Sequence, residues 1–133
     1  MRKLAVVSGV LSVLWQPVFG QRATKSGEQG HGIAFASFAP LNTDIFIADA
    51  DGSNAKSLIA HTELDYNPSF SPDGGWVVFT STRNGSADIF RVRPTGDDLE
   101  RLTDDAAFDD QGVISPDGRF LAFVSSRSGQ ADI

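Results

Sequence analysis

The 133-residue sequence contains no cysteine, which excludes a disulfide framework, a thiolate metal site and a thiol nucleophile. It has only two histidines, His31 and His61, and neither belongs to a His-Glu-x-x-His zinc motif. A Gly-x-Ser-x-Gly nucleophile elbow and a glycine-rich phosphate loop are also missing. The sequence therefore predicts no catalytic, cofactor-binding or metal-binding residue.

The sequence also lacks any segment with a sustained helical period. From Ile33 onward it consists of short apolar runs separated by turn residues, which is the pattern of β-strands. Apolar residues make up 41% of the chain and include ten phenylalanines, so a hydrophobic core can form. A charged fraction of 21% and a mean hydropathy of −0.12 are typical of a soluble globular protein.

The first twenty residues have the three-part layout of a secretory signal peptide. A basic start (Met1–Lys3) precedes twelve mostly apolar residues (Leu4–Trp15), and a cleavage site is expected after Gly20. The alternative is a buried N-terminal strand or helix, whereas a membrane anchor would need about 20 apolar residues. We expect a signal peptide at 1–20, a flexible lead-in at 21–32 and no membrane span after cleavage.

Cleavage would leave a strongly acidic chain. It removes two of the eleven basic residues and none of the seventeen acidic ones, so the net charge becomes 9 − 17 = −8. Such a surface repels phosphate backbones, and we therefore expect no nucleic-acid partner.

A repeat of 44 residues organises the rest of the chain. Ile33–Ser37 returns as Val77–Ser81 and again as Leu121–Ser125. A repeat of this length is normally one supersecondary unit that must stack on its neighbours to bury its apolar faces. The predicted copies cover about 33–65, 66–109 and 110–133.

The middle copy predicts four antiparallel strands, at Tyr66–Phe70, Trp76–Ser81, Asp88–Arg93 and Leu99–Thr103. Four strands per 44 residues match the blade of a β-propeller. The predicted fold class is all-β, and the 113 residues after Gly20 correspond to about 2.6 blades, an incomplete open arc compared with the 4–8 blades of closed propellers. We therefore expect a longer protein, or a partner that covers the ends of the arc.

The most motif-like residues recur once per copy, which favours a structural role. In the Ser-Pro-Asp-Gly turns the aspartate can accept backbone hydrogen bonds. The aspartates at the start of each third strand are expected to bond nearby backbone. The turn residues are Ser71, Pro72, Asp73, Gly74, Ser115, Pro116, Asp117 and Gly118, and the strand-start residues are Asp44, Asp88 and Asp132.

The densest acidic segments are Asp97–Glu100, Asp104–Asp105 and Asp109–Asp110. Their spacing matches no calcium loop, so we interpret them as solvated loops between blades. Trp76 aligns with Phe120 and is expected to pack between blades.

The segments Asn67–Phe79, Arg83–Phe90 and Leu102–Thr103 resemble the TolB-type WD-like propeller repeat. Ile114–Ile133 resembles the same repeat, and Ile33–Leu58 resembles its second half. The resemblance implies a periplasmic or secreted β-propeller that serves as a platform for protein–protein contacts. It also implies a link to the cell-envelope Tol–Pal system, where the family docks with a peptidoglycan-associated lipoprotein.

These observations favour an exported, non-enzymatic binding or scaffold protein of the bacterial cell envelope, with a protein partner that the sequence does not identify. The alternative is the N-terminal propeller of a larger secreted peptidase or polysaccharide-degrading enzyme, whose catalytic part lies beyond Ile133. A Gly-x-Ser-x-Gly elbow or a His-rich metal site downstream would favour that alternative. A chain without a stable fold is a third hypothesis.

Overall fold

All regular elements in the described part of the chain are β-strands. The computed structural model describes residues 32–38 and 43–133, so the predicted signal peptide and nearly all of the predicted lead-in lie outside the described residues. Within these two ranges there is no helix that could cross a membrane. The strands are β1 (Gly32–Phe38), β2 (Thr43–Asp49), β3 (Lys56–Ile59), β4 (Asp65–Phe70), β5 (Val77–Ser81), β6 (Asp88–Val92), β7 (Glu100–Arg101), β8 (Asp109–Ile114) and β9 (Leu121–Ser125).

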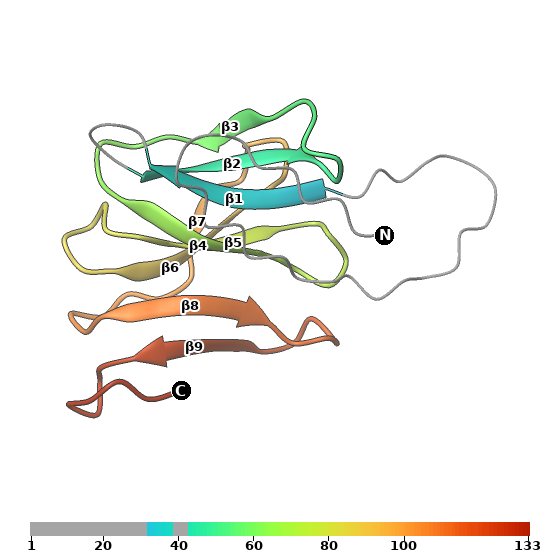
Figure 1. The fold of residues 1–133 in the computed structure, drawn as a ribbon. Coiled ribbons are helices and arrows are strands. Elements are labelled where there is room, and N and C mark those ends of the chain that lie inside the picture. Colours follow the sequence, from blue (N-terminus) through green and yellow to red (C-terminus); the bar gives the residue numbers. More distant parts are fainter. Residues whose placement is uncertain (1–31, 39–42) are drawn as a thin grey trace, which may run out of the picture.

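The strands form three antiparallel sheets, in the orders β1-β2-β3, β4-β5-β6-β7 and β8-β9, which we call the first, second and third sheets. The sheets stack with the second between the other two (Figure 1). The second sheet has the four consecutive strands of a propeller blade, and none of the three closes on itself. The predicted all-β, open architecture is confirmed.

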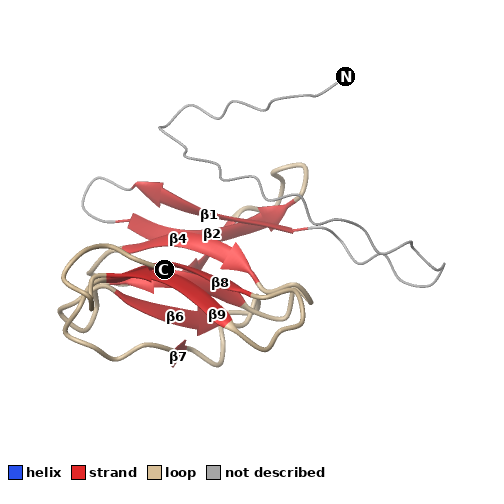
Figure 2. Cartoon of the chain, turned by 90° about the horizontal axis from the view of Figure 1, so that it is seen from below, coloured by secondary structure: helices blue, strands red, loops and turns tan. Residues whose placement is uncertain are grey.

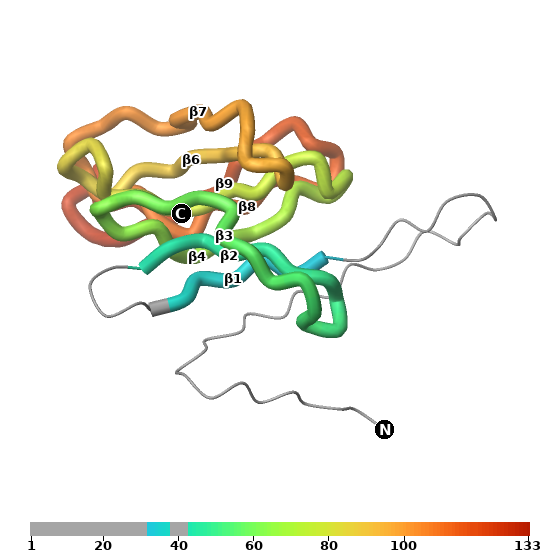
Figure 3. The backbone as a smooth tube through the Cα atoms, turned by 90° about the horizontal axis from the view of Figure 1, so that it is seen from above, coloured from blue at the N-terminus to red at the C-terminus, as the bar shows by residue number. Residues whose placement is uncertain are grey.

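The connecting loops gather at the two ends of the strands (Figure 2). The short strand β7 lies at one edge of the molecule (Figure 3) and consists of two polar residues, Glu100 and Arg101. This strand lies within the predicted fourth strand, Leu99–Thr103, and is shorter than predicted.

The 44-residue spacing reappears in the backbone conformation. Asn67 and Gln111 have positive φ angles, 51° and 56°, and each lies where the pairing register of its strand shifts. An extra residue in a strand produces this β-bulge and bends the strand locally. Strands β4 and β8 therefore share the same bend at the same position.

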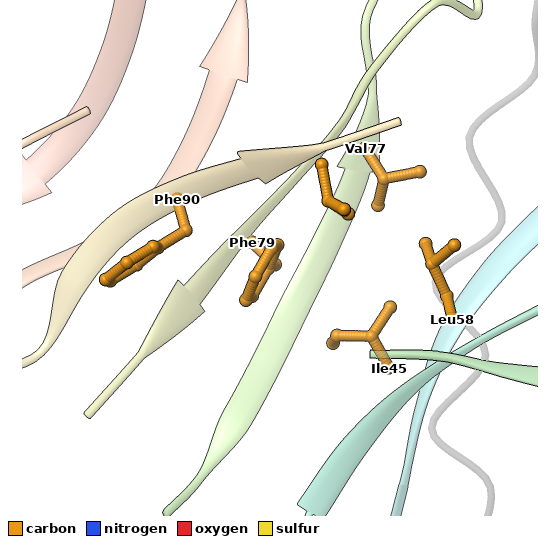
Figure 4. Packing of buried hydrophobic residues seen from close by; sticks show 6 residues of the cluster. Ile45, Leu58, Val77, Phe79 and Phe90 are labelled. Carbon is orange, nitrogen blue, oxygen red and sulfur yellow. The ribbon is translucent and has the colours of Figure 1, made fainter. Parts of the chain in front are cut away.

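The hydrophobic core lies between the first and second sheets (Figure 4). Side chains from both sheets pack against one another there. The rings of Phe79 and Phe90 stack with their centroids 5.9 Å apart. Full burial of each such side chain contributes roughly 1.5–3 kcal/mol. The buried members are Ile45, Leu58, Val77, Phe79, Phe90 and Val92.

Strand β5 is buried on both faces. Val77 and Phe79 belong to the core shared with the first sheet, while Val78 and Thr80 contact the third sheet. All four side chains are fully buried. This double burial explains why β5 has consecutive apolar residues instead of the alternation of a half-solvated strand.

The second and third sheets join through polar and apolar contacts. The Asp110 carboxylate accepts hydrogen bonds from Thr80 Oγ1 at 2.7 Å and Asn67 Nδ2 at 2.9 Å. Two residues further along β8, the Gly112 carbonyl accepts a hydrogen bond from Ser69 Oγ at 2.8 Å. These bonds place β4 and β8 side by side and in the same direction.

Gly112 leaves no room for a side chain, and this generates a prediction. A Cβ atom there would lie 2.7 Å from Ile89 Cγ2 and 3.1 Å from Val78 Cγ1. Because both neighbours are packed core residues, Gly112→Ala should destabilise the chain by about 1–3 kcal/mol, the usual cost of overpacking. Urea unfolding followed by circular dichroism measures the change. Gly32→Ala, where the new Cβ would meet only ordinary contacts of 3.5 and 3.6 Å, is the control, and equal losses in both variants would contradict the prediction.

Candidate functional site

The predicted turn residues bond within their own turns. Ser71 Oγ donates to Asp73 Oδ1 at 2.5 Å and accepts from Trp76 N at 2.9 Å, and the Gly75 N–H donates to Asp73 at 3.0 Å. The Ser71 hydroxyl and, after it, the Gly75 N–H lower the pKa of Asp73 below its ordinary value.

The second turn repeats these bonds. Ser115 Oγ donates to Asp117 Oδ1 at 2.6 Å and accepts from Phe120 N at 2.9 Å. The Ser115 hydroxyl and then the Arg119 N–H lower the pKa of Asp117. Each serine–aspartate pair therefore forms hydrogen bonds within its own turn. These side chains do not point together into a shared binding site.

The predicted strand-start aspartates have different surroundings. Asp44 accepts a hydrogen bond from the His61 backbone N–H at 3.3 Å, and Asp132 accepts one from the Ser128 hydroxyl. Fully buried Asp88 accepts from Arg101 Nη2 at 2.7 Å and so forms an ion pair with a side chain, where a bond to nearby backbone was expected. Arg101 lies on the neighbouring strand β7, which explains why chain-local reasoning missed it.

The interpretation of Asp109 and Asp110 as part of a solvated loop is wrong. Both lie in β8 and are 0% and 8% exposed. The physical reason is that each carboxylate has fixed donors: Asp109 accepts from Ser125 Oγ at 2.7 Å and Arg127 Nη2 at 2.6 Å. Asp104 and Asp105 are exposed, as expected.

Trp76, which was expected to pack between blades, contacts two cations of its own sheet. The guanidinium carbons of Arg91 and Arg93 lie 4.1 and 3.7 Å from the centre of its ring. Both arginines belong to or follow β6 of the same sheet, so the indole is covered by cations from its own blade. Phe120, at the equivalent position, is 63% exposed.

Sequence reasoning missed a buried ion pair that recurs at the 44-residue spacing. In the second sheet, Arg83 Nη2 donates to both oxygens of Asp65 at 2.8 and 2.9 Å, and Arg83 Nε donates to Ser81 Oγ at 2.8 Å. Residues at the same offset form the corresponding group in the third sheet: Asp109, Ser125 and Arg127. The recurrence of Asp, Ser and Arg at fixed positions was the signal that could have revealed it.

Each buried aspartate follows an exposed, large apolar residue. Leu64 precedes Asp65 and is 44% exposed, and Phe108 precedes Asp109 and is 46% exposed. The backbones of the two apolar residues are held in the same way. Leu64 exchanges hydrogen bonds with Thr82, and Phe108 exchanges them with Ser126.

These two residues lie at the same end of neighbouring strands, because β4 and β8 run side by side in one direction. Charged residues lie close to them in the chain: Glu63 precedes Leu64, and Asp105, three residues before Phe108, lies 3.7 Å from Arg127. We call this area the Leu64–Phe108 surface, and it comprises Glu63, Leu64, Asp105, Phe108 and Arg127.

A depression lies between the second and third sheets, away from the Leu64–Phe108 surface. Its two cations are already paired: Arg91 with Glu100 at 2.6 Å, and Arg119 with Asp117 at 3.9 Å. Among the described residues no cluster of three or more His, Asp or Glu side chains could hold a metal ion. The depression is lined by Arg91, Leu102, Ile114, Gly118, Arg119, Phe120 and Leu121.

The repeated blade, with its recurring turns and ion pairs, agrees with a comparison to known families. A family model described as "TolB beta propeller domain" matches residues 23–133. The chain belongs to the TolB β-propeller family. The TolB-type resemblance of the sequence is thereby confirmed.

Two curated TolB relatives match the chain over 61 residues each. The Tol-Pal system protein TolB of Geobacter sulfurreducens is 34% identical, over 46% of this chain and 13% of that protein. The protein of the same name from Nitrosomonas europaea is 39% identical, over 44% of this chain and 14% of that protein. The crystal structure of TolB from Acinetobacter baumannii superposes with a TM-score of 0.67 and 29% identity, covering 75% of this chain and 25% of that one. The chain thus spans a quarter or less of the length of these relatives.

The two buried ion pairs of this TolB-type propeller differ in exposure, which generates a prediction. Arg83 is 10% exposed beside fully buried Asp65, whereas Arg127 is 43% exposed beside fully buried Asp109. Arg83→Leu leaves the buried Asp65 carboxylate without its cation and should therefore destabilise the chain by about 3–5 kcal/mol. Arg127→Leu should cost less, because water can reach the remaining carboxylate more easily.

Urea unfolding at 25 °C measures both variants. Arg119→Leu is the control, because Arg119 is 73% exposed and 3.9 Å from its partner, and it should change stability by less than about 0.5 kcal/mol. Equal losses of unfolding free energy in Arg83→Leu and Arg119→Leu would show that the buried pair contributes no more to stability than the exposed one.

Proposed function

We propose that this chain is an exported, non-enzymatic propeller module that binds a protein partner in the bacterial cell envelope. Membership of the TolB β-propeller family supports this proposal, as do relatives named as Tol-Pal system proteins. The periplasm is the proposed location, with residues 1–20 acting as the signal peptide. The proposed partner is a peptidoglycan-associated lipoprotein of such a system.

The observation that carries the proposal is the recurrence of an exposed, large apolar residue at one strand position in two successive sheets. Leu64 and Phe108 occupy this position with nearly equal exposures of 44% and 46%. Scattered surface apolar residues need no explanation, but two at equivalent positions on adjoining strands form a surface that a partner can cover.

The backbone beneath this surface is pre-organised for binding. Thr82 and Ser126 hold the backbones of Leu64 and Phe108, and the Asp65–Arg83 and Asp109–Arg127 ion pairs anchor the residues that follow. A rigid apolar anchor loses little conformational entropy on binding, which increases affinity without additional contacts.

The rim of the surface indicates the chemistry of the partner. Glu63 and Asp105 contribute two negative charges next to the apolar residues, Arg127 beside Asp105 contributes one positive charge, and the chain as a whole carries a net charge of −6. Interfaces commonly combine an apolar centre with a polar rim of complementary charge. The proposed contact face of the partner is therefore an apolar patch bordered by lysine or arginine.

A charge-introducing substitution on the Leu64–Phe108 surface tests the proposed binding. Leu64→Asp and Phe108→Asp should each weaken binding to the peptidoglycan-associated lipoprotein of the same bacterium at least tenfold, because a central apolar anchor commonly contributes about 2 kcal/mol. Isothermal titration calorimetry measures the affinity, and thermal unfolding verifies that both variants remain folded.

Phe120→Asp is the matched control for this experiment. Phe120 is 63% exposed, but it follows the Ser115–Gly118 turn at the opposite end of the strands, so binding should be unchanged. An equal loss in the control would reject the Leu64–Phe108 surface, and the absence of any binding by the unmodified chain would reject this partner.

Export is tested separately, on bacteria that produce the full chain. Periplasmic extracts should contain a mature form whose N-terminal residue is Gln21, because the predicted cleavage follows Gly20. Mass spectrometry of the fractions identifies the N-terminus. A product that keeps Met1 and stays in the cytoplasm would contradict export.

A further inference from the structure

The turn between β5 and β6 contains an asparagine followed directly by a glycine, Asn84 and Gly85. Both residues are exposed, and Gly85 has a positive φ of 96°. A Cβ atom at Gly85 would meet nothing within 4 Å beyond its chain neighbours. Because glycine has no side chain that could shield its backbone nitrogen, the Asn84 side chain has open access to that nitrogen.

These two groups can react with each other without a catalyst, because the chain already holds them one residue apart. A new bond forms from Gly85 N to Asn84 Cγ, the bond from Cγ to Nδ2 breaks, and the Gly85 proton leaves with Nδ2 as ammonia. Water then opens the resulting cyclic imide. Opening at Cγ gives aspartate, whereas opening at the backbone carbonyl carbon gives isoaspartate, whose main chain runs through Cγ and is longer by a methylene group.

The other asparagines of the described residues lack these features. Asn54 Nδ2 donates to Asp49 at 2.6 Å, and the next residue is alanine. Asn67 Nδ2 donates to Asp110 at 2.9 Å, and Pro68 after it has no backbone N–H to lose. Within the described ranges, the side chain in the β5–β6 turn has no hydrogen-bond partner.

The Asp-Gly turns of the chain are a second useful contrast. In the turns of Asp51, Asp73 and Asp117 the backbone N–H two residues later donates to the carboxylate, at 2.9, 3.0 and 3.1 Å. Each carboxylate is thereby bonded to an N–H other than that of the glycine directly after it. An ionised carboxylate is also a poorer electrophile than a neutral amide, so the reaction is expected at Asn84 and not in these turns.

The turn that contains Asn84 also supports the Leu64–Phe108 surface. The Gly85 N–H donates to the Thr82 carbonyl at 3.0 Å and closes the turn. Thr82 in turn holds Leu64 on both sides: its N–H donates to the Leu64 carbonyl at 3.0 Å, and its Oγ1 accepts from the Leu64 N–H at 3.1 Å. A longer main chain between Thr82 and Gly85 would therefore change the support of Leu64.

We propose that Asn84 is a modification site at which the folded chain deamidates itself, giving aspartate and isoaspartate in the β5–β6 turn. In the isoaspartate form the added methylene group separates Gly85 N–H from the Thr82 carbonyl, so the bond that closes the turn is lost. Thr82 then holds the backbone of Leu64 less firmly. The reaction consumes only water, and the proposal goes beyond the proposed binding function and does not depend on it.

The same three residues, Asn84, Gly85 and Ser86, also have the sequence of an N-glycosylation acceptor. The folded turn favours deamidation over that modification, because the half-buried Ser86 hydroxyl is already bonded to the Asp105 carbonyl at 3.1 Å. Mass spectrometry of the chain isolated from its bacterium distinguishes the two, and a glycan on Asn84 would overturn the proposal.

Ageing of the full chain tests the reaction. After several weeks in warm, mildly alkaline buffer, the peptide that contains residue 84 should gain the mass difference between an amide and a carboxyl group, with isoaspartate as the main product. Asn84→Gln is the matched control, because it keeps an amide but would have to close a larger ring, and its peptide should stay unchanged. Asn54 and Asn67 should keep their amides in the same sample.

Hydrogen–deuterium exchange on the aged chain tests the structural consequence. The amides of Leu64 and Thr82 should exchange roughly fivefold faster than in the fresh chain, the effect of losing one hydrogen bond, while the buried amide of Val78 should be unchanged. Asn84→Asp carries the new charge without the added methylene group, so it should exchange like the fresh chain.

Three results would each overturn the proposal. The first is an Asn84 amide that survives in the folded chain although it reacts in the urea-unfolded chain. The second is loss of the Asn54 amide at the same rate in the folded chain. The third is an isoaspartate product in which Leu64 and Thr82 exchange as slowly as in the fresh chain.

Discussion

The packing of the second sheet between its two neighbours is the interaction on which the rest of the structure depends. Strand β5 carries Val77 and Phe79 on one face and Val78 and Thr80 on the other, all fully buried. An isolated sheet would expose one of these sets, and each large apolar side chain left in water forgoes roughly 1.5–3 kcal/mol. The loss of a few such contacts would rival a domain's whole stability of about 5–15 kcal/mol. The fold therefore requires stacking, and the repeat supplies it.

Hydrogen bonds and ion pairs of buried polar residues also hold the stacked sheets together. Asp110 joins β8 to the second sheet through Thr80 and Asn67. The buried Asp65–Arg83 pair anchors the start of β4, and the neighbouring Leu64 is thereby displayed at the surface. Stability and the proposed binding thus share the same residues: the ion pairs that organise the strand ends also fix the apolar side chains offered to a partner.

Much of the fold could be predicted from the sequence, because the same strand and turn patterns recur at a fixed spacing of 44 residues. The strands β4, β5 and β6 lie within a residue or two of their expected positions, and the turn at Ser71 bonds within itself. The errors concern residues whose partners lie on other strands. Asp109 and Asp110 resemble a solvated acidic loop in the sequence, yet donors from β4, β5 and β9, and from Arg127 just after β9, make them buried. The partner of Asp88, Arg101 on β7, was hidden for the same reason.

The sequence by itself determined the repeat length, the all-β class and the strand and turn positions, because backbone preferences and apolar periodicity act between near neighbours in the chain. Only the tertiary structure decided which charges are buried and which apolar residues remain exposed. Those properties depend on contacts between residues 18 to 43 positions apart in the chain, as in the Asp65–Arg83 pair and the Asn67–Asp110 bond. Leu64 and Phe108 resemble core residues in the sequence, and only the position of the strand ends makes them a surface.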